Sequence, residues 1–301
     1  MKDLISMREL SKKDILALVD ISGKIEAGEI SPDLNRKVAA LIFLEPSTRT
    51  HFSFDTAMKR LGGQTISMIG TETTSLKKGE SFSDTLKTIS MYADIIVIRS
   101  PIEGAARYAS ECVNIPVINA GDGTNQHPTQ SLLDLYSIVK TQGTLENLTL
   151  GIVGDLKHGR TVHSLVQALS HFSPTLYFFS PSFLKMPDDL LDDLAAKGIR
   201  FEVRKEIDET IYDLDLLYVT RIQKERFSDL EDYERVKGSY RITRAMLAGV
   251  KTHFKIFHPL PRVDEISPEV DDTSCAYYFQ QAKNGVYMRQ AIISTLLECL
   301  P

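Results

Sequence analysis

The apolar residues of this chain fall into short blocks separated by amphipathic segments. The run Val38–Leu44 is too short for a core helix and predicts a buried strand. Phe54, Ala57 and Leu61 then recur at helical spacing, which predicts a helix that ends at Gly62. Further segments predict strands at 64–69, 93–99, 115–120, 148–155, 176–179, 214–220 and 254–257. Strands that alternate with helices predict an α/β fold of doubly wound parallel sheets with helices on both faces.

The length of 301 residues favours two domains of this kind. Thr141–Thr144 follows a predicted helix and precedes a new strand, so it has the position of a hinge. We therefore expect one domain over 1–140 and a second over 141–283. Apolar residues at helical spacing predict a final helix within 284–301 that packs back on the first domain.

Two polar stretches interrupt the alternation. Thr71–Glu80 is longer than a tight turn, and long loops inside a compact domain are often functional. Asp229–Arg244 is charged and poor in apolar residues, which predicts a mobile loop. Taken alone, Thr71–Glu80 is better explained as a solvated, mobile loop than as a functional one.

Composition excludes several classes of function. A net charge of -5 and the lack of a basic run argue against a nucleic-acid surface. The N-terminus has no apolar core of signal-peptide length, and no apolar run is long enough to cross a membrane. The 3 cysteines are scattered and odd in number, as in proteins of a reducing compartment. We expect a cytoplasmic protein with no membrane partner.

Ser47, Thr48, Arg49 and Thr50 lie between the first predicted strand and its helix. A helix start offers unpaired backbone N–H groups and a positive dipole end, and hydroxyl and guanidinium donors complement a phosphate. By itself Ser47 is also explained as an ordinary N-cap and Arg49 as a surface charge. The remaining motifs favour the anion site.

Further polar side chains follow other predicted strands, open helices or lie in the polar loop Thr71–Glu80. They are Ser75, Lys78, Arg99, His127, Gln130, Arg160, Arg221 and Gln223. In open parallel sheets, ligands collect outside the carboxyl ends of the strands. His127 precedes Pro128 at a helix start, where the dipole disfavours a cation, so a neutral imidazole could donate to a carbonyl oxygen. Each of these residues alone is compatible with a purely structural role.

The turn His258–Arg262 ends the last predicted strand and contains two prolines. Prolines remove backbone donors, which leaves the carbonyl oxygens of Pro259 and Leu260 available as acceptors. A cis Leu260–Pro261 bond would aim them. A rigid strand-ending turn is the simpler alternative.

A dinucleotide cofactor is not expected. Gly151, Gly154 and Gly159 do not form the G-x-G-x-x-G fingerprint, and the next strand ends in Ser-Pro-Ser rather than in an acid. The sequence has no Walker-A loop, no metal-ligand cluster and no recognisable nucleophile with its base. Chemistry without a covalent nucleophile or a metal leaves positioning and electrostatic stabilisation.

The motifs together resemble the aspartate/ornithine carbamoyltransferase family over nearly the whole length, and more closely the catalytic chains that use aspartate. The resemblance rests on Pro46-Ser-Thr-Arg-Thr50, Ser75-Leu-Lys-Lys-Gly-Glu80, His127-Pro-Thr-Gln130, Gly154-Asp-Leu-Lys-His-Gly-Arg160, Thr220-Arg-Ile-Gln-Lys-Glu-Arg226 and His258-Pro-Leu-Pro-Arg262. Members that use ornithine carry His-Cys-Leu-Pro near the end. The resemblance implies transfer of a carbamoyl group from carbamoyl phosphate to L-aspartate, giving N-carbamoyl-L-aspartate and phosphate, in pyrimidine biosynthesis.

The resemblance also implies a role for each residue. Ser47, Thr48, Arg49 and Thr50 would hold the phosphate with Arg99, while Thr50, Arg99 and His127 would polarise the carbamoyl carbonyl. Gln130 and the carbonyls of Pro259 and Leu260 would hold the carbamoyl amino group. Arg160, Arg221 and Gln223 would bind the carboxylates of aspartate. The catalytic set would be Arg49, Thr50, Arg99 and His127, in a carbamoyl-phosphate-binding first domain followed by an aspartate-binding second domain.

Partners follow from the same resemblance. Ser75 and Lys78 would reach the site from a neighbouring subunit of a homotrimer, and regulatory chains are candidate partners. Glu45 would bridge to basic residues of the second domain when the domains close. His51 departs from the family, which commonly has arginine there, so the arginine's structural salt bridge is in question.

Two other interpretations stay open at this point. A sibling carbamoyltransferase would use ornithine or another amine, and a substrate panel separates it from the aspartate enzyme. A non-enzymatic metabolite sensor or inactive scaffold would show no turnover of carbamoyl phosphate. Under the favoured interpretation, cationic side chains distant in sequence converge on one cleft between the two lobes.

Overall fold

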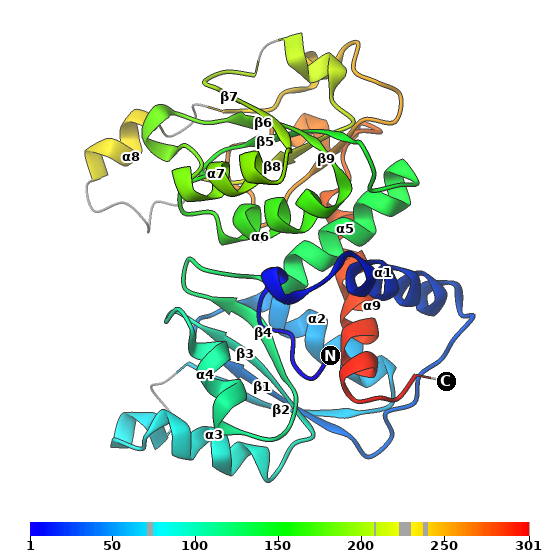
Figure 1. Cartoon of the computed structure of the whole chain (residues 1–301), viewed down its shortest axis with the longest axis vertical. Helices are drawn as coiled ribbons and strands as arrows, with labels where there is room; N and C mark the ends of the chain where they lie inside the picture. The colour runs from blue at the N-terminus through cyan, green and yellow to red at the C-terminus, as the bar shows by residue number, and fades with distance from the viewer. Residues whose placement is uncertain (71–74, 208, 223–229, 237–239, 301) are drawn as a thin grey trace. The chain divides into compact units, whose positions relative to one another are not determined.

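The chain forms two compact units in a computed structural model that describes residues 1–70, 75–207, 209–222, 230–236 and 240–300 (Figure 1). One unit comprises Met1–Tyr136 with Ala282–Pro301, and the other comprises Ser137–Gln281. The unit boundary at 136/137 and the expected boundary at 140/141 lie within the same helix, α5. The expected doubly wound α/β architecture is confirmed, including the final helix that belongs with the first unit.

The first unit is built on a parallel sheet in the order β2-β1-β3-β4. Its strands are β1 Val38–Phe43, β2 Gln64–Ile69, β3 Ile95–Ser100 and β4 Val117–Asp122. Its helices are α1 Lys12–Ala27, α2 Thr48–Arg60, α3 Phe82–Ser90, α4 Ala105–Cys112, the start of α5 Pro128–Gln142, and most of α9 Tyr278–Leu296, with short turns η1 Met7–Glu9 and η2 Ser75–Lys78.

Alternating strand residues divide the core of this unit between two faces. Ala40 and Ile42 of β1 pack with Leu86 of α3 and Ala106 of α4 on one face. The other face is covered by α2, where Phe54 is fully buried, and by α1 and α9 (Figure 1). Coverage on both sides explains why β1 and the first four residues of β3 are continuously apolar rather than alternating.

Local sequence signals set the helix boundaries. Ser11 and Asp14 form a complete capping box: the Asp14 N–H donates to the Ser11 hydroxyl, and the Ser11 N–H donates to the Asp14 carboxylate at 3.0 Å. Pro128 opens α5 because a proline lacks only an N–H that the first helical turn would leave unpaired.

His51, where the resemblance implies an arginine, links α2 to two strands of the sheet. Its Nε2 lies 3.0 Å from the Ser67 hydroxyl on β2. Its ring contacts the edge of the Phe43 ring, with centroids 5.2 Å apart. A neutral ring can make both contacts, so this position connects α2 to the strands without needing the arginine's charge.

The second unit has a parallel sheet in the order β7-β6-β5-β8-β9. Its strands are β5 Thr149–Val153, β6 Thr175–Phe179, β7 Arg200–Arg204, β8 Leu216–Val219 and β9 Lys255–Phe257. Its helices are α6 Arg160–Leu169, α7 Asp188–Ala196 and α8 Leu230–Val236, with turns η3 Ser170–Phe172, η4 Ser182–Leu184, η5 Glu209–Asp213, η7 Arg244–Leu247 and η8 Pro268–Val270. Figure 1 shows α6 and α7 against one face of this sheet.

The opposite face of the second sheet buries a cluster that draws on distant segments. Val153, Leu217 and Val219 contribute from the strands, and Ile242 and Val270 contribute from later turns. Short 3-10 turns rather than long helices therefore cover much of this face.

The prediction of a loop throughout 229–244 is wrong, because Leu230–Val236 forms α8. The few apolar residues of this stretch suggested a loop, yet leucine, glutamate and arginine all favour helix locally. Two further elements, α7 and the edge strand β7, had no prediction. Among the residues that the structure describes, no helix is both long and apolar enough to cross a membrane.

Asp215 connects β5, β8 and the segment before β9. Its carboxylate accepts from the Thr149 N–H at 2.8 Å, from Lys251 Nζ at 2.7 Å and from His253 Nε2 at 3.0 Å. Burial works against ionisation, but these donors outweigh it and hold the pKa of Asp215 below its ordinary value.

We expect Asp215→Asn to lower the free energy of unfolding of the second unit by about 1–2 kcal/mol. The reason is that Lys251 and His253 lose their bonds to a charged acceptor. Urea unfolding at neutral pH measures this change. Asp20→Asn is the matched control, since Asp20 forms an exposed pair with Lys24 on a helix surface and should cost no more than ~0.5 kcal/mol. Equal losses in the two variants would contradict the structural role of Asp215.

Candidate active site

The first group of candidate residues lies at the carboxyl edge of the first sheet. Neighbouring strands β1, β3 and β4 run parallel, so the residues that follow them emerge at one edge. Ser47–Thr50 follows β1, Arg99 is near the end of β3, and His127 follows β4. The sheet thus brings together three motifs that are spread along the chain from residue 47 to residue 127.

The start of α2 has the properties of an anion site. Ser47 is the N-cap, yet its hydroxyl makes no capping bond to the helix, and the first turn contains no acidic residue. Arg49 is exposed and Thr50 is buried. The positive end of the helix dipole is therefore not offset by an acid within the first turn.

Arg99 is held in place by the ends of two other strands. Its Nη2 donates to Glu45 Oε1 at 3.0 Å, and its Nη1 donates to the Ala120 carbonyl at 3.3 Å. Its side chain is only 11% exposed. Glu45, expected to bridge to the second domain, has this partner within the first unit, and the pair orients the guanidinium at the sheet edge.

His127 and Gln130 occupy the first turns of α5, and both are buried. The His127 carbonyl accepts the Gln130 N–H at 3.0 Å, while its ring Nδ1 lies 3.5 Å from the Thr129 hydroxyl. The Gln130 amide nitrogen donates to Asp134 Oδ1 at 2.8 Å. Asp134 had no predicted role; the signal for it was a carboxylate four residues after Gln130 on the same helix.

The second group lies at the carboxyl edge of the second sheet. Arg160 begins α6 after β5 and is buried, Arg221 follows β8 and is half-buried, and Pro259 and Leu260 follow β9. Strands β5, β8 and β9 are neighbours, so these residues also share an edge. Gly154 makes the edge compact: a Cβ there would lie 2.0 Å from the Thr220 carbonyl oxygen, so its glycine identity has a packing reason.

The turn after β9 is fixed by His258. The Leu260 N–H donates to His258 Nδ1 at 2.8 Å, which leaves Nε2 as the protonated nitrogen that donates to Glu265 Oε1 at 2.6 Å. The Leu260–Pro261 peptide bond is cis. Arg262, part of the same motif, is instead bound by Asp271 and the Tyr278 hydroxyl.

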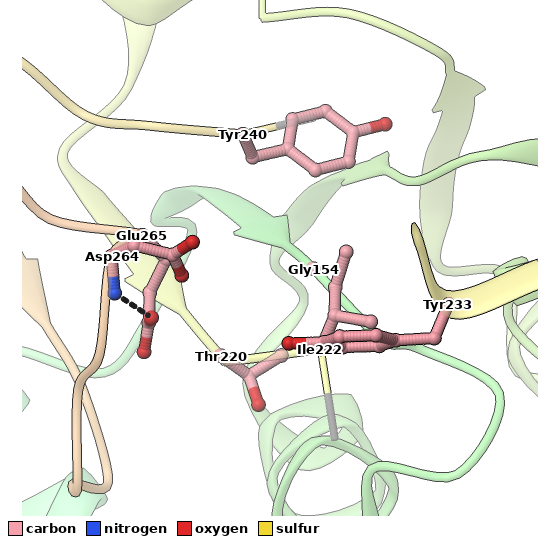
Figure 2. A pocket seen from close by; sticks show the side chains of 7 residues that line it. All are labelled: Gly154, Thr220, Ile222, Tyr233, Tyr240, Asp264 and Glu265. Carbon is pink, nitrogen blue, oxygen red and sulfur yellow. Dashed lines mark hydrogen bonds between the residues drawn. The ribbon is translucent and has the colours of Figure 1, made fainter. Parts of the chain in front are cut away.

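A pocket in the second unit opens beside this edge (Figure 2). Its lining residues are Gly154, Thr220, Ile222, Tyr233, Tyr240, Asp264 and Glu265. Figure 2 shows the tyrosine rings on one side and the two carboxylates on the other. Burial and the charge of Glu206 raise the pKa of Tyr240 to about 12, so its phenol is neutral. Carboxylates repel an anionic substrate, so the nearby arginines rather than this pocket are the candidate anion-binding groups.

Three expected residues receive little or no structural description. Lys78 lies exposed in η2. The backbone of Ser75 belongs to the same turn, but its side chain lies outside the described structure, as does Gln223. Their roles stay predictions.

Two parallel-sheet units, each with arginines at the carboxyl edge, define a two-domain α/β protein with candidate anion-binding groups. Residues 2–140 match the carbamoyl-P binding domain of aspartate/ornithine carbamoyltransferase, and residues 146–296 match its Asp/Orn binding domain. The chain belongs to the aspartate/ornithine carbamoyltransferase family.

Individual proteins similar to this chain carry names of the same family. The chain is 52% identical over 297 residues to an aspartate carbamoyltransferase catalytic subunit of Parabacteroides distasonis, covering 98% of this chain and 97% of that one. The catalytic subunit of Methanocaldococcus jannaschii aspartate transcarbamoylase superposes with a TM-score of 0.92 at 52% identity, over 99% of this chain and 98% of that chain. The Trypanosoma cruzi enzyme, solved with N-(phosphonacetyl)-L-aspartic acid, has a TM-score of 0.90 at 38% identity, over 97% and 94%.

Glu265 provides a test of the turn after β9. Its Oε2 accepts from the Val263 and Asp264 N–H groups, both at 3.0 Å. Burial opposes its ionisation, but the His258 donor and backbone donors outweigh that effect and lower the pKa of Glu265. In Glu265→Gln, the amide nitrogen must face one set of donors, so we expect a loss of about 1–3 kcal/mol in unfolding free energy at pH 7.

The loss should depend on pH. Because the folded-state pKa of Glu265 is depressed, its stabilisation is complete above the unfolded value and is lost as pH falls through the folded value. Urea unfolding at pH 7 and at a series of pH values below 4.5, the ordinary carboxyl pKa, should therefore show the two proteins converging on acidification. The exposed Glu269 supplies the control variant Glu269→Gln. A difference that stays constant down to strong acid would refute the ionised pair.

Proposed function

We propose that this chain transfers the carbamoyl group of carbamoyl phosphate to the α-amine of L-aspartate, giving N-carbamoyl-L-aspartate and phosphate, a step of pyrimidine biosynthesis. The observation that carries the proposal is the match of both units to one family, with relatives near 50% identity named aspartate carbamoyltransferase catalytic subunits. The Trypanosoma cruzi relative has also been solved with carbamoyl phosphate and aspartate.

In the first unit, Ser47, Thr48, Arg49 and Thr50 hold the phosphate at the start of α2, with Arg99 on its other side. Hydroxyls, backbone N–H groups and guanidinium forks together supply the donors that three phosphate oxygens accept. The support is the exposed Arg49 in a first helical turn without acids, and Arg99 oriented by Glu45.

The carbamoyl group itself needs both donors and acceptors. Thr50, Arg99 and His127 donate to its carbonyl oxygen, while Gln130 and the carbonyls of Pro259 and Leu260 accept from its amino group. His127 suits this role as a neutral donor because it lies at the positive end of α5.

Aspartate carries two carboxylates, and Arg160, Arg221 and Gln223 of the second unit bind them. Guanidinium groups form paired hydrogen bonds with carboxylates but would repel the side-chain ammonium of ornithine. This charge pattern favours aspartate over the amine that the sibling enzymes use.

The reaction then needs no covalent intermediate with the protein. The neutral α-amine attacks the carbamoyl carbon, a tetrahedral oxyanion forms, and the C–O bond to phosphate breaks. Each donor aimed at the oxyanion is worth about 3 kcal/mol, and orientation of two bound reactants adds ~7 kcal/mol or more. The departing phosphate is a base that can accept the amine proton.

We further propose a cytoplasmic homotrimer with active sites shared between subunits, in which Ser75 and Lys78 serve a neighbouring chain. Support comes from the open edge of the first sheet. Its edge strand β2 and adjacent α2 expose Ile66, Ile69 and Phe52 at 41%, 56% and 61%, and exposed apolar side chains of this kind mark association surfaces. The three cysteines are all unbridged, in keeping with a reducing compartment.

The first test is turnover. We expect the wild-type protein to carbamoylate aspartate in preference to ornithine, and Arg49→Ala to lower kcat/KM for carbamoyl phosphate by about a hundredfold or more, because a transition-state phosphate contact is lost. Unchanged circular dichroism would show that the fold survives. Exposed Arg60→Ala, at the far end of α2, is the control. Near-normal turnover by Arg49→Ala would remove the assigned role.

The shared site predicts complementation. Lys78→Ala and Arg49→Ala chains should each be nearly inactive alone. After mixing, a hybrid oligomer contains interfaces at which intact Arg49 of one chain meets intact Lys78 of its neighbour, so part of the activity should return. If subunits demonstrably exchange and no activity returns, each site lies within one chain.

A further inference from the structure

Two opposite charges are buried in the first unit outside the set that contacts substrate. Asp134 of α5 is 0% exposed and Arg289 of α9 is 3% exposed. Removing a charge from water is costly unless another charge or hydrogen bonds compensate it. Their burial therefore calls for a reason beyond packing.

Arg289 is accommodated by residues of α2 and by a glycine of its own helix α9. Its Nη1 donates to the Ser53 hydroxyl of α2 at 2.9 Å, and its guanidinium lies 4.9 Å from the centre of the Phe54 ring. Gly285 leaves room for it, since a Cβ there would lie 2.3 Å from Nη1. Burial lowers the pKa of Arg289 to about 10, while the negative charge of Asp134 works in the opposite direction. Arg289 is thus a cation at neutral pH, and Asp134 balances it.

Asp134 determines which way the Gln130 side chain faces. Its Oδ1 accepts from the Gln130 amide nitrogen at 2.8 Å, one helical turn away. An ionised carboxylate can only accept hydrogen bonds, so it must face the NH2 arm of the amide. The reversed amide would place oxygen against oxygen. The amide oxygen of Gln130 is therefore directed away from Asp134.

We propose that Asp134, whose charge Arg289 balances, is a positioning residue that presents the Gln130 oxygen to the substrate and thereby selects carbamoyl phosphate over acyl phosphates of the same shape. The inference rests on the proposed function, in which Gln130 accepts from the carbamoyl amino group. An NH2 group donates to that oxygen, whereas a methyl group of similar size cannot. A buried acceptor left without a donor penalises the methyl analogue.

Two stable phosphonates serve as probes. Phosphonoacetamide carries the amino group, and acetonylphosphonate carries a methyl group in its place. We expect the wild-type protein to bind the amide more tightly by calorimetry. Asp134→Asn can present either a donor or an acceptor to Gln130, so it should reduce the ratio of the two affinities about tenfold. The reduction should come from weaker binding of the amide. Binding of the methyl compound and of inorganic phosphate should stay unchanged.

Companion variants separate positioning from loss of fold. Asp134→Asn with Arg289→Met removes both buried charges, so no cation is left unbalanced, and should lose the same selectivity. In a Gln130→Leu background, Asp134→Asn should change the ratio no further, because the group through which it acts is gone. Asp94→Asn is the matched control: Asp94 accepts from Lys37 and the Val38 N–H in the same unit, and its removal should affect stability but not the ratio.

The outcomes distinguish the two claims. An unchanged affinity ratio in both Asp134 variants, or a loss of both ligands in parallel, would overturn the positioning role. A wild-type protein that selects the amide probe but turns over no carbamoyl phosphate with any amine would overturn the proposed function and leave the selectivity argument standing.

Discussion

Parallel hydrogen bonding within each sheet is the constraint on which the candidate chemistry depends. Phe43 of β1 pairs with Arg99 of β3, and the Leu44 N–H donates to the Arg99 carbonyl at 2.8 Å. This register brings the motif Ser47–Thr50, which follows β1, to the same edge of the sheet as Arg99, more than forty positions later in the chain. Because these strands are covered on both faces, a one-residue slip would exchange the side chains between the two packed faces, so packing fixes the position of the site.

The arginines of this acidic protein separate into two groups by their surroundings. Arg262 is bound by Asp271 and stacks near Tyr278, and Arg289 is enclosed by α2, α5 and α9; both organise the fold around the site. Arg49 and Arg221 retain exposure at the edges of their sheets. Arg99 has features of both groups. Glu45 holds it in place, and it lies at a sheet edge where a phosphate could also reach it. The local field near such groups, rather than the net charge, selects the substrate.

Sequence reasoning succeeded where local chemistry determines local structure. The N1 proline Pro128 and the apolar strand that begins at Val38 appear as expected. It did not identify β7, whose charged and partly exposed residues belong to an edge strand stabilised by its neighbour β6. Edge strands carry a weak apolar signal because only part of each strand is buried. The helix α8 was missed for the opposite reason, since helix propensity there outweighed a low apolar content.

The amino-acid sequence by itself determined the class of fold, the order of the motifs and the chemistry they can perform, because strand burial, helix capping and side-chain donors are properties of short segments. The tertiary structure alone decided which acids accompany the arginines and which way the Gln130 amide faces. Those facts depend on contacts between residues such as Ser53 and Arg289, 236 positions apart. No local pattern encodes such a contact, because only the packing of the completed unit brings the two helices together.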